Sequence, residues 1–201
     1  MSKVILVANQ CDFVPIEKDV SYIGVDGGSF FCLSNNIPML CAIGDFDSID
    51  EPQFKQLQTY TKLIQLPCEK NETDGEYALR YAYDQGFDEI DMYGVIGGRQ
   101  DHFIAMITLL RHSQIDFRII DEQNTIYTLQ AGNHKIKKKY KYLSFFACED
   151  LNITLSKVRY PLENRHITEK DVYLVSNEII EDECELYITG KILVIESNDK
   201  Q

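Results

Sequence analysis

The chain has 201 residues, of which 44% are hydrophobic, and its formal net charge is −12 at pH 7. This length and composition allow a substantial buried core, in one large domain or two small ones, and exclude disorder of the whole chain. Acidic residues outnumber Lys and Arg by 32 to 20, so we expect no nucleic-acid partner, because affinity for a phosphate backbone depends on clustered cations.

The cysteines and the N-terminus favour a cytoplasmic protein. Six cysteines stand at positions 11, 32, 41, 68, 148 and 184, without a CxxC pair or the spacing of a zinc site. Free, mostly buried thiols in a reducing cytosol are the simplest interpretation. The first apolar run is shorter than that of a signal peptide, and no stretch approaches the roughly 20 apolar residues of a membrane span, so we expect no membrane partner.

Over the first 120 residues, short β-branched runs alternate with helical patterns. We expect strands at residues 4–8, 22–25, 40–43, 63–66, 90–93 and 117–120. A helix is predicted over residues 73–85, where Thr73 and Glu76 form a capping-box pattern and Gly86 follows the last turn, and another over residues 101–112. This alternation predicts an α/β fold with a largely parallel sheet covered by helices.

After residue 124 the pattern changes to alternating strands without a helix. We expect them at residues 125–129, 142–147, 152–155, 172–175, 186–189 and 192–195. The change predicts an N-terminal α/β domain over residues 1–122 and a C-terminal antiparallel β-sandwich over residues 123–201. The basic run HKIKKKYK at residues 134–141 is interpreted as an exposed hairpin whose lysines discourage edge pairing.

Acidic residues follow four successive predicted strands of the α/β domain. They are Asp26, the pair Asp45 and Asp47 within GDFDS, Asp74, and Asp101. Each alone fits a turn or the start of a helix. Ligands of open α/β sheets bind at the carboxyl ends of the strands, however, and carboxylates gathered there repel one another unless a cation neutralises them. Mg²⁺ suits such a cluster, because it takes one or two carboxylates and fills its other positions with water and substrate phosphates.

Glycines and an arginine near these acids favour a nucleotide. Gly27, Gly28, Gly97 and Gly98 would let the backbone approach phosphate oxygens, and Arg99 suits a bidentate phosphate contact. The chain has neither a GxxxxGK[ST] P-loop nor a GxGxxG motif, which makes a Walker-type kinase or a Rossmann dehydrogenase less favoured. Together the residues predict a Mg²⁺-nucleotide site for phosphoryl-type transfer.

Seven motifs along the chain resemble, in the same order, those of the thiamine pyrophosphokinase family. In the first part of the chain they are VDGG at 25–28, GDFDS at 44–48, ETDGEYAL at 72–79 and GVIGGRQDH at 94–102. In the second part they are YPLEN at 160–164, VSNE at 175–178 and GKILVIES at 190–197. The resemblance covers nearly the whole chain, and the ordered set is more specific than any one motif.

The resemblance implies an enzyme that transfers the pyrophosphoryl group of ATP to the hydroxyethyl oxygen of thiamine, giving thiamine diphosphate and AMP. It also implies a homodimer that holds thiamine between the two domain types of opposite subunits. Carried over by motif, the metal ligands would be Asp45, Asp47 and Asp74, with Asp26 completing the acidic rim, and the nucleotide would be bordered by Gly27, Gly28, Gly97, Gly98 and Arg99. Asp101 would orient the substrate, while Ser176 and Asn177 would contact thiamine.

Some points stay open at this stage. Either Asp26 or Asp101 could accept the proton of the thiamine alcohol. The chain has no Trp, so a Tyr or Phe would have to stack against thiamine, or the contact is absent. The alternatives are a DxD-type metal-dependent nucleotide-sugar transferase and a non-catalytic nucleotide sensor on the same fold.

Overall fold

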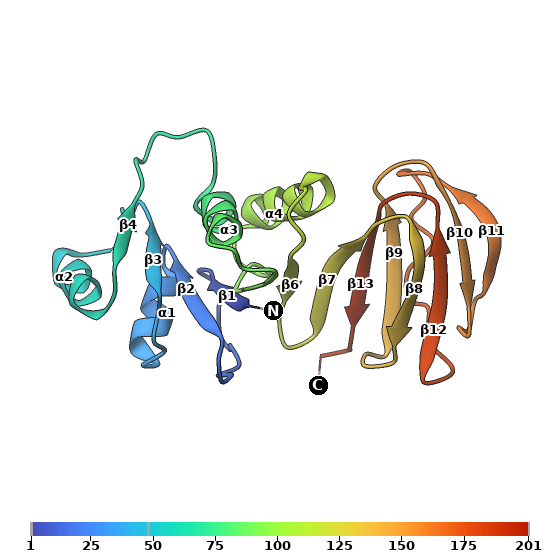
Figure 1. The fold of residues 1–201 in the computed structure, drawn as a ribbon, viewed down its shortest axis with the longest axis horizontal. Coiled ribbons are helices and arrows are strands. Elements are labelled where there is room, and N and C mark those ends of the chain that lie inside the picture. Colours follow the sequence, from blue (N-terminus) through green and yellow to red (C-terminus); the bar gives the residue numbers. More distant parts are fainter. Residues whose placement is uncertain (1, 48, 201) are drawn as a thin grey trace. The chain divides into compact units, whose positions relative to one another are not determined.

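A computed structural model describes residues 2–47 and 49–200, which form two compact units (Figure 1). Unit 1 contains the chain up to Leu109 together with Ser113–Asp121. Unit 2 contains Leu110–His112 and the chain from Glu122 onward. Among the described residues, no helix is long and apolar enough to cross a membrane.

Unit 1 is built on a parallel sheet. Its strands are β1 (Lys3–Val7), β2 (Ser21–Val25), β3 (Cys41–Gly44), β4 (Leu63–Gln65), β5 (Glu89–Tyr93) and β6 (Arg118–Ile120). They lie in the order β4-β3-β2-β1-β5-β6, and their pairings are parallel. The six predicted strands of this region are confirmed. The order reverses beside β1, so a crevice is expected at the carboxyl ends of β1 and β5.

Four helices follow strands of this sheet. They are α1 (Gly28–Ser34), α2 (Glu51–Tyr60), α3 (Asp74–Asp84) and α4 (Gln100–His112). The two predicted helices correspond to α3 and α4. The Thr73 hydroxyl caps α3 by accepting the Glu76 N–H at 3.1 Å, and Gly86 follows it with φ +86°.

The other two helices were not predicted individually, although α2 carries a sequence signal. Asp50 and Gln53 form a complete capping box, and Pro52 stands in the first turn. By contrast, α1 is only seven residues long and follows Gly27, which has no side chain to cap it. The first residue of α1 is Gly28. Any other residue would clash there, because a Cβ would lie 2.0 Å from the Val7 carbonyl oxygen.

Both faces of the sheet are covered. Ile5 and Val7 of β1 pack in a cluster with Cys32 of α1. Val4 and Leu6 point to the other face and are fully buried, and α3 packs across β1, β2 and β3. Burial on both faces is typical of parallel sheets and explains the continuous apolar run of β1.

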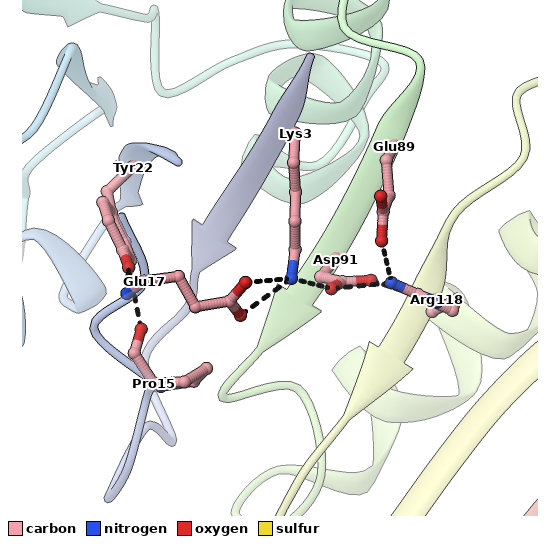
Figure 2. A network of polar contacts seen from close by, with 7 residues as sticks. All are labelled: Lys3, Pro15, Glu17, Tyr22, Glu89, Asp91 and Arg118. Carbon is pink, nitrogen blue, oxygen red and sulfur yellow. Dashed lines mark hydrogen bonds and ion pairs between the residues drawn. The ribbon is translucent and has the colours of Figure 1, made fainter. Parts of the chain in front are cut away.

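A network of charged residues lies at the amino ends of β1, β5 and β6 (Figure 2). Asp91, only 1% exposed, accepts from Arg118 Nε at 2.6 Å and lies 3.2 Å from Lys3 Nζ. Lys3 also donates to Glu17 at 2.8 Å, and Arg118 to Glu89. Burial alone would lower the pKa of Arg118, but the Asp91 hydrogen bond and the charges of Asp91 and Glu89 raise it. The buried carboxylate is therefore matched by cations.

Unit 2 contains antiparallel strands in two groups. One group is β7 (Asn124–Leu129), β13 (Ile192–Ser197) and β9 (Tyr142–Ala147), in that order. The other is a separate four-stranded sheet of β11 (Leu162–Ile167), β10 (Leu151–Ser156), β12 (Glu183–Ile188) and β8 (Gly132–Lys137). Residues of both groups, such as Phe145 of β9 and Ile153 of β10, share one hydrophobic cluster. As predicted, the described part of the chain after residue 122 contains no helix.

Three expectations for unit 2 were wrong in detail. Residues 172–175 form no strand: three of the four side chains in this Val- and Tyr-rich run are exposed, and its Leu174 carbonyl accepts a single backbone bond from Phe145 of β9. β11 was missed because its sequence, LENRHI, is mostly polar, and in the structure only its Ile167 is buried. The basic run is not a hairpin: its first residues belong to β8, a single edge strand in a different sheet from β7, and Lys135 pairs with Glu183 at 2.7 Å.

Candidate active site

Unit 1 contains a cavity of about 500 Å³ at the carboxyl ends of its strands. Its walls come from the segments that follow β1, β2, β3, β4 and β5 and from the first turns of α3 and α4. The polar side chains in these walls are Asn9, Gln10, Asp26, Asp45, Asp47, Lys70, Glu72, Thr73, Asp74, Arg99 and His102. Five are carboxylates, so the parallel topology brings acids far apart in sequence to one place.

The Asp45–Asp47 segment is held by the residue between the two acids. Phe46 is 5% exposed and packs against Phe54 of α2, with ring centroids 5.9 Å apart. Its backbone has φ +56°, a left-handed conformation that is strained for a bulky side chain. The buried ring anchors this turn, and both flanking carboxylates line the cavity. The Asp47 N–H donates to Asp45 Oδ1 at 3.3 Å.

Asp26 also adopts a left-handed conformation, with φ +48°. Its Oδ2 accepts from Asn9 Nδ2 at 3.0 Å. Its Oδ1 is buried and has no hydrogen-bond partner within residues 2–47 and 49–200. Buried polar atoms are nearly always partnered, so this free oxygen indicates a group that expects a ligand.

Asp74 starts α3 and faces a lysine. Asp74 Oδ1 lies 3.2 Å from Lys70 Nζ, and Asp45 Oδ2 lies 3.6 Å from the same nitrogen. The Asp74 contact is an ion pair without hydrogen-bond alignment, since Oδ1 has no hydrogen-bond partner in the described chain. Burial raises the pKa of the Asp74 carboxyl; Lys70 opposes this rise, and the nearby charges of Asp45 and Asp26 add to it.

The residues expected to border a nucleotide divide into two groups. Gly97 and Arg99 line the cavity. Gly27, Gly28 and Gly98 are not among its lining residues, and Gly28 instead packs on the backbone of β1.

Asp101 also lies outside the cavity lining. It is exposed and forms a bidentate pair with Arg99, which is 76% exposed. The Arg99 hydrogen bond lowers the pKa of the Asp101 carboxyl. In this arrangement the Arg99 guanidinium is bound to the Asp101 carboxylate, and a phosphate group would have to displace that carboxylate in order to bind Arg99.

Ser176 and Asn177 lie in unit 2. Ser176 is exposed, has φ +58° and donates its N–H to Ser144 Oγ at 2.9 Å. The Asn177 side chain is buried and binds both the N–H and the carbonyl of Tyr160, at 3.0 and 2.9 Å. Asn177 therefore supports the loop that presents Ser176. Two exposed aromatic residues are connected to this segment: Asn177 binds the backbone of Tyr160, and Tyr173 precedes Ser176 by three residues in the chain.

Sequence reasoning gave no role at the site to six polar residues that line the cavity: Asn9, Gln10, Lys70, Glu72, Thr73 and His102. Asn9 and Gln10 follow β1, the central strand, and the rule that ligands bind at strand ends already pointed to them. Lys70 carried no sequence signal, because a lysine in a polar loop is normally solvated.

Comparisons with known proteins assign the chain to a family. The model of the thiamin pyrophosphokinase catalytic domain matches residues 16–120, and that of the thiamin pyrophosphokinase vitamin B1 binding domain matches residues 133–193. The chain belongs to the thiamin pyrophosphokinase family. The first match contains the acidic cavity residues, and the second contains Ser176 and Asn177.

Individual members of the thiamin pyrophosphokinase family support this assignment. A protein of Bacillus subtilis (strain 168) named thiamine pyrophosphokinase is 35% identical over 192 residues, which is 91% of this chain and 90% of that protein. A crystal structure of thiamine pyrophosphokinase from Bacillus subtilis is similar with a TM-score of 0.87 and 32% identity, covering 98% of this chain and 100% of that one. A thiamin pyrophosphokinase family protein from Enterococcus faecalis has a TM-score of 0.88 and 31% identity, covering 99% and 100%.

Proposed function

We propose that the chain transfers the pyrophosphoryl group of ATP to the hydroxyethyl oxygen of thiamine, producing thiamine diphosphate and AMP. The observation that carries this proposal is the cavity of unit 1, where five carboxylates meet at the carboxyl edge of a parallel sheet in a chain of this family. No observation favours a nucleotide-sugar transferase. A DxD motif alone does not predict the DGG motif before it or the TD and VSNE motifs after it in this chain.

The acidic residues fit Mg²⁺ in chemistry. Hard carboxylate oxygens are the ligands it prefers, and Asp74 Oδ1 is buried, has no hydrogen bond in the described chain and contacts only the Lys70 ammonium. Among residues 2–47 and 49–200, no three His, Cys, Asp or Glu side chains form a ready metal cage. Mg²⁺ needs none, because one or two carboxylates suffice when water and phosphate complete the coordination. Asp45, Asp47 and Asp74 would hold it, and when bound it would neutralise charge on phosphate oxygens.

The reaction asks the protein mainly for positioning. The thiamine oxygen forms a bond to the β-phosphorus of ATP, the bond from that phosphorus to the oxygen shared with the α-phosphorus breaks, and AMP leaves with that oxygen. The hydroxyl proton must pass to a base. The free buried oxygen of Asp26 in the cavity supports Asp26 in this role over Asp101, which is paired with Arg99.

Unit 2 would be the thiamine-binding β-sandwich. Its two groups of antiparallel strands with a shared hydrophobic cluster, and its match to the vitamin B1 binding domain, support this role. We also propose a cytoplasmic homodimer with thiamine between the two domain types of opposite subunits. Light scattering during size-exclusion chromatography tests the dimer, and a mass of one 23.2 kDa chain would contradict it.

The activity is tested by incubating the protein with ATP, Mg²⁺ and thiamine and separating the products by chromatography. We expect AMP and thiamine diphosphate in equal amounts, formed only when thiamine is present. Formation of ADP, or no turnover, would reject the proposal. Nucleotide binding without turnover would indicate a sensor on the same fold.

A further inference from the structure

Lys70 is a cation of the cavity that the sequence analysis did not assign. It lies in the segment between β4 and α3, and its side chain is only 12% exposed. Its ammonium lies 3.2 Å from Asp74 Oδ1 and 3.6 Å from Asp45 Oδ2, and it donates to the Pro67 carbonyl at 3.1 Å. A lysine this buried is unusual unless it is paired.

The position of this ammonium differs from that of Arg99, the other permanent cation in the cavity walls. Arg99 is 76% exposed and is bound to Asp101 outside the cavity. Lys70 instead contacts two of the three carboxylates that we assign to the metal. An ammonium on a flexible four-carbon stem can change partners by rotating its stem, whereas a paired guanidinium must give up two hydrogen bonds.

We propose that Lys70 is the resident counter-ion of the acidic cavity and exchanges between two partners. Without nucleotide it neutralises Asp45 and Asp74, and with nucleotide it binds the phosphate oxygens. This inference rests on the proposed function, because it takes the phosphate donor to be a metal-bound nucleoside triphosphate.

The exchange has a thermodynamic consequence. A divalent ion alone competes with the ammonium for Asp45 and Asp74, so Lys70 weakens binding of the free ion. A metal-bound nucleotide offers the displaced ammonium new oxygens, so the same residue strengthens binding of the complex. Lys70 therefore couples the two ligands and favours occupation by metal and nucleotide together.

The test measures two affinities of Lys70→Met by isothermal titration calorimetry. The ligands are Mg²⁺ alone and the Mg²⁺ complex of α,β-methylene ATP, in which the bond that would be broken is blocked. We expect Mg²⁺ alone to bind roughly tenfold more tightly than to the wild type, and the analogue roughly tenfold more weakly, the scale of one charge-assisted hydrogen bond. Lys70→Arg keeps the charge and should remain near the wild type for Mg²⁺ alone.

Lys55→Met is the matched control, because Lys55 is 68% exposed, pairs with Glu51 on α2 and lies outside the cavity. It should change neither affinity. If either affinity of Lys70→Met equals that of the wild type, the exchange is overturned. Should that variant fail to fold, Lys70→Gln supplies the same two affinities. The wild-type AMP assay is independent, so failure of the proposed function can be distinguished from failure of this inference.

Discussion

The two edges of the parallel sheet of unit 1, at the amino and the carboxyl ends of its strands, differ in their charge. At the amino ends, the buried carboxylate of Asp91 contacts both Arg118 and Lys3 (Figure 2). At the carboxyl edge, five carboxylates line one cavity; Lys70 contacts Asp45 and Asp74 and Arg80 pairs with Glu72, while Asp26 Oδ1 has no hydrogen-bond partner in the described chain. The same sheet thus carries matched charge at one end and excess negative charge at the other.

The difference separates a structural role from a functional one. A buried ion pair whose members are all partnered stabilises the packing of neighbouring strands and has no unpaired charge with which a ligand could interact. An excess of carboxylates costs free energy in the empty protein, and a cationic or metal-bound ligand recovers it. Strained backbone at Asp26 and Phe46 accompanies the acidic end, as is common at functional sites.

The largest expected effect comes from the acidic end. Asp47→Asn removes one proposed metal ligand from an exposed position, so we expect thiamine-dependent AMP formation to fall about 10² to 10³-fold, the usual cost of losing one charge-stabilising group. Thermal unfolding should change little. Wild-type turnover of this variant at saturating Mg²⁺ would contradict the metal assignment.

Removing charge at the amino end should affect stability instead. Asp91→Leu removes the buried carboxylate and leaves the partly buried Lys3 and Arg118 with Glu17 and Glu89 alone, and we expect a loss of about 3 kcal/mol in the free energy of unfolding. Urea unfolding and amide exchange in β1 and β5 measure it. Lys55→Met breaks an exposed helix pair and should cost no more than about 0.5 kcal/mol. Equal effects of the two variants would show that the network has no special role.

Glu196 of β13 provides an intermediate case, a buried carboxylate that accepts from the neutral Tyr127 hydroxyl at 3.0 Å. Burial raises the pKa of Glu196. Because the pKa of Glu196 is higher in the folded than in the unfolded protein, its protonation stabilises the folded state. This stabilisation is complete below the unfolded pKa of about 4.3 and is lost as pH rises through the folded pKa. The Gln side chain of Glu196→Gln cannot ionise. We therefore expect the free energy of unfolding of this variant, minus that of the wild type, to be larger at pH 8 than at pH 4. Urea unfolding at both pH values measures this, and an equal difference at both would contradict it.

The smallest effect is a change in labelling rate. Cys68 is exposed and lines the cavity, whereas burial raises the pKa of Cys11, Cys41 and Cys184 to about 11 and that of Cys32 to about 12. Ellman's reagent at pH 8 should therefore modify Cys68 first, and Mg²⁺-ATP should slow the reaction. A fast phase that persists in Cys68→Ser, or that ignores the nucleotide, would contradict this.

Much of unit 1 could be predicted because its local signals agree with its tertiary environment. Parallel strands buried on both faces read as continuous apolar runs, and Thr73 and Gly86 mark the ends of α3. Unit 2 was harder. The exposed run at residues 172–175 has a strand-like composition but no regular ladder in the described chain, whereas β11 has a paired neighbour but a polar composition. Strand formation depends on pairing, which composition does not determine.

The sequence by itself determined the class of unit 1, the acidic strand ends and the family, because these depend on residue type, order and spacing. The tertiary structure decided which of the named residues meet: Asp26, Asp45, Asp47 and Asp74 line one cavity with Gly97 and Arg99, while Asp101 turns to Arg99 outside it. It also placed Lys70 between Asp45 and Asp74, and Asn9 against Asp26. Burial and the distance between charges arise only when distant segments pack, so no local pattern contains them.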